Sequence, residues 1–354
     1  MAASSLAIGI DGRELAGRPT GTGRYLRSLL RHWREGSDTL VLYFDGPPPS
    51  DPVLEHPRIR LRSVGQGRSR GLVWQQSLLP SRLREDALDV FFSPAYACPL
   101  RADLPRVTAV HDLSFFAYPQ DFAYLDGLRR RLLVGASVAA SRSVLVCSDF
   151  TRRELARLFP HLAERARHVP LGPDEDLPQA PPRDTVRARL GLAGPLLITV
   201  GAILNRRCLP ELLRATARLR RAYPGLLLDV VGENRTHPPA DLAGLVSRLG
   251  LDRNVRLSGF VDDAGLAERY AAADAAVFLS EYEGFGLPAL EAAARGVPLV
   301  VSRRPSLAEV FADAAVLVEP RDEHAIAAAL DRVLGDPVHA ERQRQAGRAL
   351  AARH

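Results

Sequence analysis

The feature that most constrains this chain is a strand–helix alternation that occurs twice. In the N-terminal half, short apolar runs (LAIGI, LVLYF, DVFFS, VTAV and SVLVCS) are separated by helical segments such as GRYLRSLLRHW. In the C-terminal half, the runs LLITV, LLLDVV, VRLSG, AAVFLS, LVVS and AAVLVE alternate with segments such as PELLRATARLRRAY. Apolar strands without polar alternation are typical of parallel sheets covered by helices on both faces. The sequence therefore predicts an α/β protein with two doubly wound domains.

A proline-rich, acidic stretch marks the boundary between the two alternations. The chain has 354 residues, which is long for a single hydrophobic core. The segment PLGPDEDLPQAPPRD contains few apolar residues and is typical of a linker. We therefore predict an N-terminal domain at 1–172, a linker at 173–185 and a C-terminal domain at 186–337. The polar helix expected at 338–354 should pack back on the N-terminal domain.

The expected binding site follows from this architecture. In open parallel sheets, ligands bind at the carboxyl ends of the strands. Two such sheets facing each other would share a central cleft, and we expect the domains to close around a ligand by a hinge motion.

The basic side chains are all arginines, because the sequence contains no lysine among its 47 basic residues. Lysine Schiff-base chemistry is therefore excluded, and every cationic contact is a planar, permanently charged fork that suits phosphate. The net charge of +6 permits an anionic partner. Aromatic residues make up only 6% of the chain and are not interleaved with arginines, which argues against nucleic-acid binding.

Cysteine usage and the N-terminal sequence bear on the compartment. Cys98, Cys147 and Cys208 are far apart and form no C-x-x-C pair, which favours a reducing environment and three small packed side chains. The N-terminal stretch lacks the charged and apolar regions of a signal peptide. The run LLVGASVAAS is far shorter than the roughly 20 residues of a membrane span. We therefore expect a cytoplasmic protein.

The segment FLSEYEGFGLPALEAAARGVPLVVS concentrates the chemistry of the C-terminal half. A strand ends before it, and a helix is expected from Pro288 to the residue before Gly296. The glycine-containing loop then presents backbone amides at a helix N-terminus, which suits an anion. Glu283 and Glu291 flank this loop, and carboxylates accept the protons of sugar hydroxyls. The pattern indicates a ligand with both phosphates and hydroxyls; helix-dipole stabilisation by the two glutamates is the alternative.

Other candidate residues also follow strands. Arg206 and Arg207 precede a helix and form either a solvated patch or a clamp for a diphosphate. His111 ends the VTAV strand, where it is suited to hydrogen-bond a hydroxyl and to shield developing charge. The turn Gly259–Val261 follows the VRLSG strand and is either a simple strand–helix turn or a site of backbone contacts to a base.

Three further features each have a simpler explanation. Gly23 stands in Gly-Thr-Gly before a helix expected from Arg24, where a tight turn competes with close approach to a phosphate or an acceptor. Asp174–Asp176 has the D-x-D form of a metal site, but it lies in the linker, so we predict no metal. The arginine-rich stretch Leu128–Leu133 and the region around Trp74 are read first as solvated helix faces and second as contacts to an acceptor or a membrane surface.

The string EYEGFGLPALEA resembles the signature of retaining GT-B glycosyltransferases of glycosyltransferase family 4. The resemblance extends over nearly the whole chain, through IGIDGRELAGRPTGTGRYLRSLL, VTAVHDLSFFAYP, HVPLG and RLSGFVDDAGLAERYAAADAAVFLS. The opening segment is similar to that of mannosyltransferase-like members. The resemblance implies the GT-B fold, with two Rossmann-like domains facing a central cleft.

The resemblance also implies roles for individual residues. Glu283 would lie by the donor sugar with His111, and Glu291 would hold the nucleotide ribose. Arg206 and Arg207 would clamp the diphosphate, although the family usually has Pro-Arg-Lys-Asn where this chain has Asn-Arg-Arg-Cys. Cys208 thus replaces an asparagine. The implied donor-binding residues are Gly23, Gly259, Phe260, Val261, Gly284, Phe285, Gly286, Leu287 and Glu291.

The function implied is transfer of a hexose from a nucleoside diphosphate sugar to an acceptor hydroxyl, with retention and without a metal or cofactor. GDP-mannose is favoured among GDP-, UDP-, dTDP- and ADP-sugars, and the acceptor is a glycan, a lipid-linked glycan or a small natural product. Two alternatives stay open: a nucleotide-sugar epimerase on the same fold, and a non-catalytic nucleotide-sugar-binding subunit. Peripheral contact with the inner membrane face is compatible with a lipid-linked acceptor.

Overall fold

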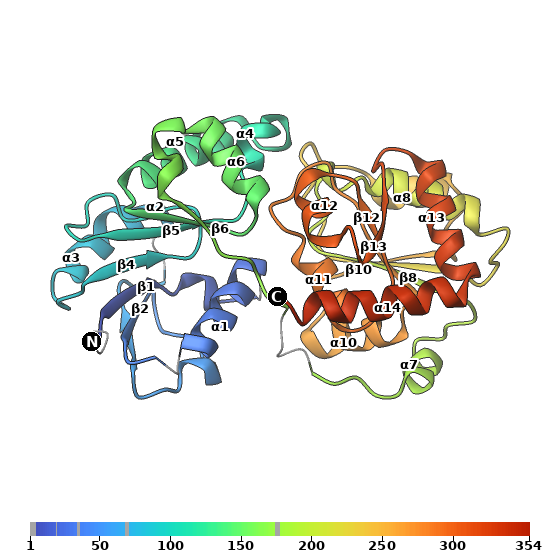
Figure 1. Cartoon of the computed structure of the whole chain (residues 1–354), viewed down its shortest axis with the longest axis horizontal. Helices are drawn as coiled ribbons and strands as arrows, with labels where there is room; N and C mark the ends of the chain where they lie inside the picture. The colour runs from blue at the N-terminus through green and yellow to red at the C-terminus, as the bar shows by residue number, and fades with distance from the viewer. Residues whose placement is uncertain (1–4, 19, 34–35, 68–70, 174–177) are drawn as a thin grey trace. The chain divides into compact units, whose positions relative to one another are not determined.

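The computed structural model describes residues 5–18, 20–33, 36–67, 71–173 and 178–354. The chain forms two compact units (Figure 1). Unit 1 contains the residues up to Phe116 together with Leu125–Pro170, and unit 2 contains Ala117–Tyr124 together with Leu171–His354. The predicted pair of parallel-sheet domains is confirmed. The short segment Ala117–Tyr124 belongs with unit 2, although the sequence analysis assigned all of 1–172 to the first domain.

Unit 1 is built on a seven-stranded parallel sheet with the order β3-β2-β1-β4-β5-β6-β7. The strands are β1 (Ala7–Asp11), β2 (Thr39–Phe44), β3 (Ile59–Ser63), β4 (Val90–Ser93), β5 (Arg106–Val110), β6 (Ser143–Val146) and β7 (Ala166–His168). The sequence analysis missed β3 and β7. Both are edge strands with mostly exposed residues, so they lack the continuous apolar run of a strand buried on both faces.

Helices flank this sheet. The α-helices are α1 (Gly21–Trp33), α2 (Gly71–Val73), α3 (Leu79–Leu83), α4 (Ser114–Ala117), α5 (Tyr124–Ala140) and α6 (Asp149–Leu158). A π-helical turn, η3 (Trp74–Leu78), joins α2 to α3, and short 3-10 turns are η1 (Arg13–Leu15), η2 (Pro52–Leu54) and η5 (Pro160–Arg165). A further 3-10 turn, η4 (Pro119–Asp121), lies in the segment that belongs with unit 2.

Strand β2 shows why the central strands are apolar throughout. Leu42 packs with Leu26 of α1 on one face of the sheet, whereas Tyr43 packs with Trp74 and Phe91 on the other. Successive side chains of a strand point to opposite faces, and both faces are covered here. Every position from Leu40 to Phe44 is therefore buried, which gives the apolar run seen in the sequence.

Unit 2 contains a six-stranded parallel sheet with the order β10-β9-β8-β11-β12-β13. Its strands are β8 (Leu196–Val200), β9 (Leu227–Val231), β10 (Val255–Gly259), β11 (Ala275–Phe278), β12 (Leu299–Ser302) and β13 (Ala315–Val318), all of which the sequence predicted. The helical elements are η6 (Asn205–Arg207), α7 (Arg183–Arg189), α8 (Leu209–Leu219), α9 (Leu242–Arg248), α10 (Asp263–Ala272), α11 (Leu287–Ala294), α12 (Pro305–Phe311), α13 (Glu323–Gly335) and α14 (Pro337–Ala351).

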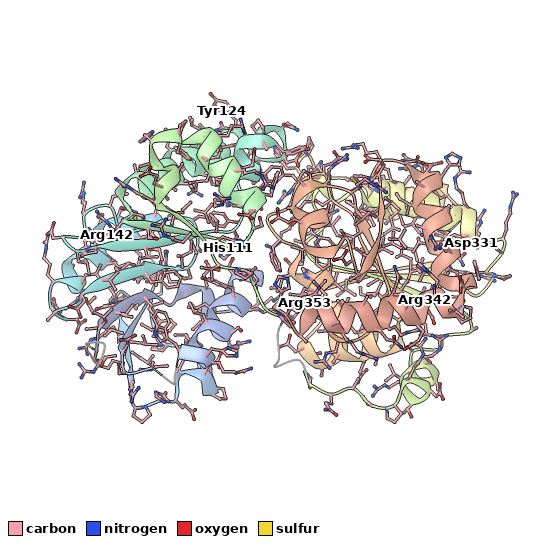
Figure 2. All side chains as sticks on the ribbon, viewed as in Figure 1. His111, Tyr124, Arg142, Asp331, Arg342 and Arg353 are labelled. Carbon is pink, nitrogen blue, oxygen red and sulfur yellow. The ribbon has the colours of Figure 1, made fainter. Side chains whose placement is uncertain are left out.

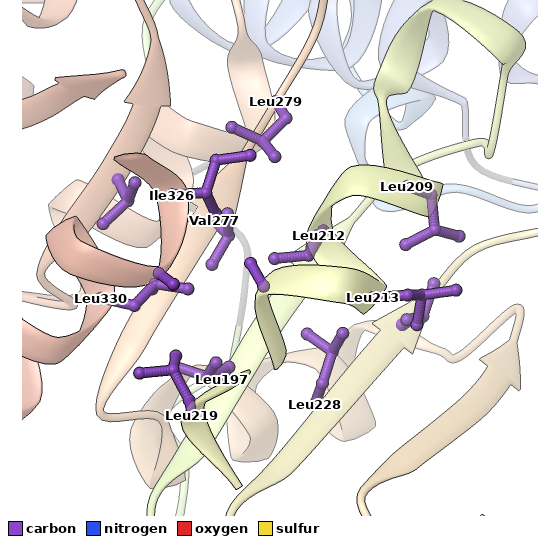
Figure 3. Packing of buried hydrophobic residues seen from close by; sticks show 14 of the residues in the cluster. Leu197, Leu209, Leu212, Leu213, Leu219, Leu228, Val277, Leu279, Ile326 and Leu330 are labelled. Carbon is purple, nitrogen blue, oxygen red and sulfur yellow. The ribbon is translucent and has the colours of Figure 1, made fainter. Parts of the chain in front are cut away.

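The core on one face of this sheet is a leucine-rich cluster (Figure 3). Leu212 and Leu213 of α8 pack with Leu228 of β9, Val277 of β11 and Leu330 of α13. Full burial of such a side chain contributes about 1.5–3 kcal/mol. The cluster therefore fixes α8 against the sheet, and with it the η6 turn that directly precedes α8.

The two ends of unit 2 differ from the sequence-based expectation. Helix α14 packs on α11 and α13, with Gly347 against Ala293, so it belongs with unit 2 (Figure 1). The analysis had placed the 338–354 segment against the N-terminal domain. Helix α7 begins at Arg183, inside the predicted linker, and is anchored by ion pairs to Asp274. Within the described residues, no helix combines the length and apolar character that a membrane crossing requires.

Candidate functional site

Loops at one edge of the unit 2 sheet bring the candidate residues together. Strands β8, β11 and β12 are neighbours, and because they are parallel, their carboxyl ends lie at the same edge. The η6 turn follows β8, the Glu281–Gly286 loop follows β11, and Arg304 follows β12. The backbone of the second loop is tied to the first by the hydrogen bond from Glu281 N to Arg206 O, at 2.8 Å.

The Gly-Phe-Gly loop carries a row of amides without protein acceptors. Residues Glu283–Gly286 are buried, and their four N–H groups donate to no acceptor among the residues that the structure describes. Gly286 has φ +96° and is the N-cap of α11, which begins at Leu287, one residue before the predicted start. A Cβ at Gly286 would lie 2.7 Å from Leu307 Cδ2. Buried N–H groups are normally hydrogen-bonded, so this row suits an anionic or hydroxyl-bearing ligand.

Glu283 and Arg207 form an ion pair at the same edge. The side chain of Glu283 is buried, its Oε1 accepts a hydrogen bond from Ser280 Oγ at 2.9 Å, and Arg207 Nε also lies 2.9 Å from it. The Arg207 guanidinium lies over the Phe278 ring, 4.3 Å from its centroid. Cation–π contact and the carboxylate together hold the guanidinium in one orientation. The structure therefore brings two of the candidate residues, Glu283 and Arg207, into direct contact.

Arg206 and Arg207 have different surroundings. Arg206 is buried, and its Nε donates to the carbonyl of Tyr282 at 3.3 Å. The guanidinium thus fastens the η6 turn to the loop that carries Glu283. The structure places both arginines beside this loop, and their role toward a diphosphate stays a prediction.

Cys208 occupies a left-handed backbone conformation. It has φ +49° and ψ +36° and joins η6 to α8. Its side chain is buried, with Sγ 3.5 Å from Arg206 O and 3.8 Å from Glu281 Oε1. Burial, with the nearby charges of Glu211 and Glu281, raises the pKa of this thiol to about 12. Asparagine is favoured in this backbone region, so the backbone at this position would accept the asparagine that the family resemblance leads us to expect.

The sequence analysis missed a cluster centred on Glu281. The Glu281 carboxylate is 3.2 Å from Arg304 Nη2 through Oε2 and 3.2 Å from Arg321 Nε through Oε1. Arg304 also pairs with Glu319 at 2.8 Å. The partners come from turns after β12 and β13, so no local spacing could indicate them.

The remaining unit 2 candidates lie on two other elements. Glu291 is 4% exposed on α11, and its Oε2 is 3.5 Å from the Tyr270 hydroxyl, which donates to it. Gly259 ends β10 with φ +62° and open space around it, and the following Phe260 is 45% exposed. The exposed Phe260 ring is accessible to a ligand, whereas the Gly259 backbone also forms a bridge with Gly232. Contacts of Gly259–Val261 to a base stay a prediction.

His111 directly follows β5 in unit 1, as predicted (Figure 2). Its Nε2 is 2.7 Å from the carbonyl oxygen of Pro94, which can only accept, so Nε2 carries the proton and a neutral ring keeps its lone pair on Nδ1. Burial lowers the pKa of His111, against the opposing effects of the Pro94 carbonyl and Asp112. The rings of Tyr25 and Tyr96 meet it edge-on. The side chain is therefore held as a neutral hydrogen-bond acceptor.

Gly23 has a packing role that the sequence did not reveal. Helix α1 begins at Gly21 rather than at Arg24. A Cβ at Gly23 would lie 2.4 Å from the carbonyl oxygen of Glu14, and its N–H donates to Thr20 Oγ1 at 3.0 Å. Close approach of α1 to η1 thus requires glycine, and contact of Gly23 with a ligand stays a prediction.

The D-x-D segment Asp174–Asp176 lies outside the described residues. Among the residues that are described, no group of three or more His, Cys, Asp or Glu side chains is arranged to hold a metal ion.

Comparison with known proteins identifies the family. The pattern described as Glycosyl transferases group 1 matches residues 183–350, and Glycosyltransferase Family 4 matches residues 19–177. O-antigen chain mannosyltransferase B of Escherichia coli is 31% identical over 348 residues, which is 90% of this chain and 87% of that protein.

Two solved structures are similar in fold. Sucrose-phosphate synthase from Thermosynechococcus elongatus has a TM-score of 0.78 and 22% identity, covering 98% of this chain and 94% of its own. HepE from Anabaena, in complex with UDP and glucose, has a TM-score of 0.76 and 19% identity, covering 99% and 95%. The chain therefore belongs to the GT-B glycosyltransferases of family 4 and is a hexosyltransferase.

Proposed function

We propose that unit 2 binds a nucleoside diphosphate sugar and that the enzyme transfers its hexose to an acceptor hydroxyl with retention of configuration. The observation that carries the proposal is the row of buried N–H groups at Glu283–Gly286, which have no acceptor among the described residues and lie beside the Arg207–Glu283 pair. Such a row, at the start of α11, offers hydrogen bonds to both phosphate and hydroxyl oxygens.

The physical problem of the reaction is charge separation. The leaving diphosphate gains negative charge while the sugar becomes cationic in character. Arg206, Arg207 and the loop amides stabilise the diphosphate, and Glu283 and His111 orient the donor sugar. Glu291 binds the ribose, and exclusion of water by closure of the enzyme protects the donor from hydrolysis.

Retention is proposed to proceed on one face of the sugar, with the donor phosphate accepting the proton of the acceptor. Glu283 is unsuited to serve as a nucleophile, because its carboxylate is engaged by Arg207 and Ser280. A glycosyl–enzyme adduct trapped on any carboxylate would contradict this part of the proposal.

The donor is proposed to be GDP-mannose. Its support is the full-length similarity to a mannosyltransferase. The UDP in the HepE complex keeps UDP-sugars as the main competitor. The acceptor is proposed to be a glycan or lipid-linked glycan, and the transfer is proposed to need no metal, since the arginines and amides supply the positive charge.

Peripheral membrane contact is a further part of the proposal, at the outer face of α5. Leu125 and Leu132 are exposed there, and Arg129 and Arg130 lie on the same helix, where the two arginines share Asp126 as an ion-pair partner and so keep a net positive charge. An apolar stripe with arginines beside it suits an anionic bilayer surface.

The test is a thermal-shift series with UDP, GDP, dTDP and ADP. A nucleotide that binds only the folded state stabilises it by about 2.7 kcal/mol at a concentration of 100 times its dissociation constant, and the melting temperature rises accordingly. We expect GDP to give the largest shift, and Gly286→Ala to abolish it, because the new Cβ would meet Leu307. Gly191→Ala is the control, since Gly191 has φ +66° and open space around it.

Two outcomes would contradict the proposal. One is the absence of a shift with every nucleotide, and the other is an undiminished shift in Gly286→Ala. Incubation of the wild type with donor alone separates the alternatives, since a new epimer of the donor would indicate an epimerase rather than a transferase.

A further inference from the structure

A hollow at the amino edge of the unit 1 sheet has a lining unlike that of the donor site. It has a volume of about 370 Å³ and is lined by Pro105, Arg106, Ala140, Ser141, Arg142 and Arg165. These residues lie where β5, β6 and β7 begin. His111 follows the other end of β5, and Figure 2 shows Arg142 well away from it. Within unit 1, the hollow is therefore separate from His111, which is assigned to the transfer reaction.

Two of its three arginines are held in place by backbone carbonyls. Arg106 donates through Nε to Ala140 O at 3.2 Å and through Nη1 to the carbonyls of Leu100 and Ala102 at 3.0 Å each. Arg165 donates through Nη1 to Ala139 O and Ser141 O at 3.0 Å each. The bonds to Ala139, Ala140 and Ser141 satisfy carbonyls at the end of α5, which lack helical partners. Nη2 of Arg106 and both Nε and Nη2 of Arg165 are left as further donors.

The charge of these arginines is not compensated by acids. None of Arg106, Arg142 and Arg165 has a carboxylate within ion-pair distance among the described residues, and the lining of the hollow contains no acid. Other arginines of this unit are paired, for example Arg84 with Asp103 and Arg157 with Glu154. The end of α5 contributes only about −0.5 charge against three guanidinium groups. The hollow is therefore strongly cationic.

We propose that this hollow binds a phosphate group carried by a small metabolite or by a lipid headgroup. Guanidinium forks bind phosphate oxygens in a bidentate manner, and two of the three are already fixed, so little side-chain entropy is lost on binding. The volume exceeds that of a single phosphate and lies in the range of small-ligand sites. The ligand therefore has a polar body attached to the phosphate.

The test measures binding of glycerol 1-phosphate to the full chain by calorimetry, with the nucleotide site saturated beforehand by a nucleoside diphosphate. Saturation removes phosphate binding at the loop of unit 2. We expect wild type to bind and Arg142→Ala to bind about tenfold more weakly, the loss of one charge-assisted contact. Arg142 is chosen because its backbone N–H, and not its side chain, makes the bond to Arg106 O.

The controls keep the result interpretable. Arg248→Ala removes an equal charge from an exposed pair in unit 2 and should leave the affinity unchanged. Arg142→Lys should fall between wild type and Arg142→Ala, because it keeps charge but loses the fork. Equal affinities of wild type and Arg142→Ala, or no binding at millimolar concentration together with no binding to vesicles, would overturn the proposal.

A second arm distinguishes the source of the phosphate. Sedimentation with vesicles of phosphatidylglycerol and phosphatidylcholine is compared with vesicles of phosphatidylcholine alone. Binding to the anionic vesicles that is lost in Arg142→Ala and kept in Arg248→Ala assigns the hollow to a lipid headgroup. Binding of glycerol 1-phosphate without such vesicle binding assigns it to a soluble metabolite.

Discussion

The candidate residues at the carboxyl edges of the two sheets differ in charge. In unit 2 they are Arg206, the Arg207–Glu283 pair and a row of amides. In unit 1 the candidate is His111, which is kept neutral by burial and fixed by the carbonyl of Pro94, while Asp11 at the end of β1 is paired with Arg13. The difference indicates separate chemical roles for the two sets of candidate residues. The unit 2 residues are suited to the charge that would develop on a leaving diphosphate, and His111 is suited to orienting neutral hydroxyls.

The largest expected effect tests the charged candidate residues of unit 2. Replacing both arginines in Arg206→Gln/Arg207→Gln should lower kcat by at least about 10³-fold, since loss of a single donor to developing charge costs about 10²–10³-fold. Steady-state transfer assays measure the change, with Arg248→Gln as the charge-matched control.

Because Arg206 is buried, the melting temperature of the double variant is measured in parallel. Should that variant unfold, Arg207→Gln alone serves, with an expected loss of about 10²-fold. Turnover that survives removal of both charges in a folded enzyme would remove the basis for assigning the diphosphate to unit 2.

A smaller effect is expected from the ion-pair cluster centred on Glu281. Glu281→Gln keeps the shape of the side chain but weakens its pairing with Arg304 and Arg321, which holds the loop beside η6. We expect the KM for the donor to rise about tenfold, equivalent to about 1.4 kcal/mol, with a smaller change in kcat, because Glu281 positions the site rather than contacts the reacting atoms. Glu319→Gln is the control, since Glu319 pairs with Arg304 on the exposed side. Equal effects of both variants would show that Glu281 has no special positioning role.

The buried, neutral His111 predicts that the stability of the protein depends on pH. Burial lowers the pKa of His111 in the folded state, so below its ordinary value of about 6.5 the unfolded chain binds a proton first. Stability from this group is therefore full above pH 6.5 and is lost as the pH falls toward the folded pKa, by up to about 1.4 kcal/mol per pH unit.

His111→Gln isolates this contribution, because glutamine keeps an N–H for Pro94 but does not titrate. Urea unfolding between pH 7.5 and 5 should show a shallower decline of stability for the variant than for wild type. Parallel declines would mean that His111 is accessible to protonation, and the contrast between the two edges would weaken.

Sequence could predict the parts of this molecule that depend on local pattern. The buried strands could be predicted because both faces of each central strand are covered. The Glu283 loop could be predicted because a strand end, glycines and a helix start follow one another in the sequence. The Glu281 cluster could not be predicted, because its arginines lie on separate turns that are distant in the sequence. Helix α14 was misplaced because a polar helix does not show which surface receives its few buried residues, such as Gln343 and Leu350.

The smallest expected effect concerns Cys208, the departure from the usual asparagine. A left-handed residue with a Cβ costs roughly 1–2 kcal/mol, and asparagine tolerates this conformation better than most. Cys208→Asn should therefore leave the free energy of unfolding unchanged or raise it by up to about 1 kcal/mol. Cys208→Val should lower it by about 2 kcal/mol or more, because a β-branched residue is strongly disfavoured there. Since Sγ is buried against Arg206 O and Glu281, the nucleotide affinity of Cys208→Asn should match that of wild type. If a different nucleotide stabilised this variant, position 208 would instead be a determinant of donor choice. The donor-binding residues of unit 2 would then include the residue that directly follows the two arginines.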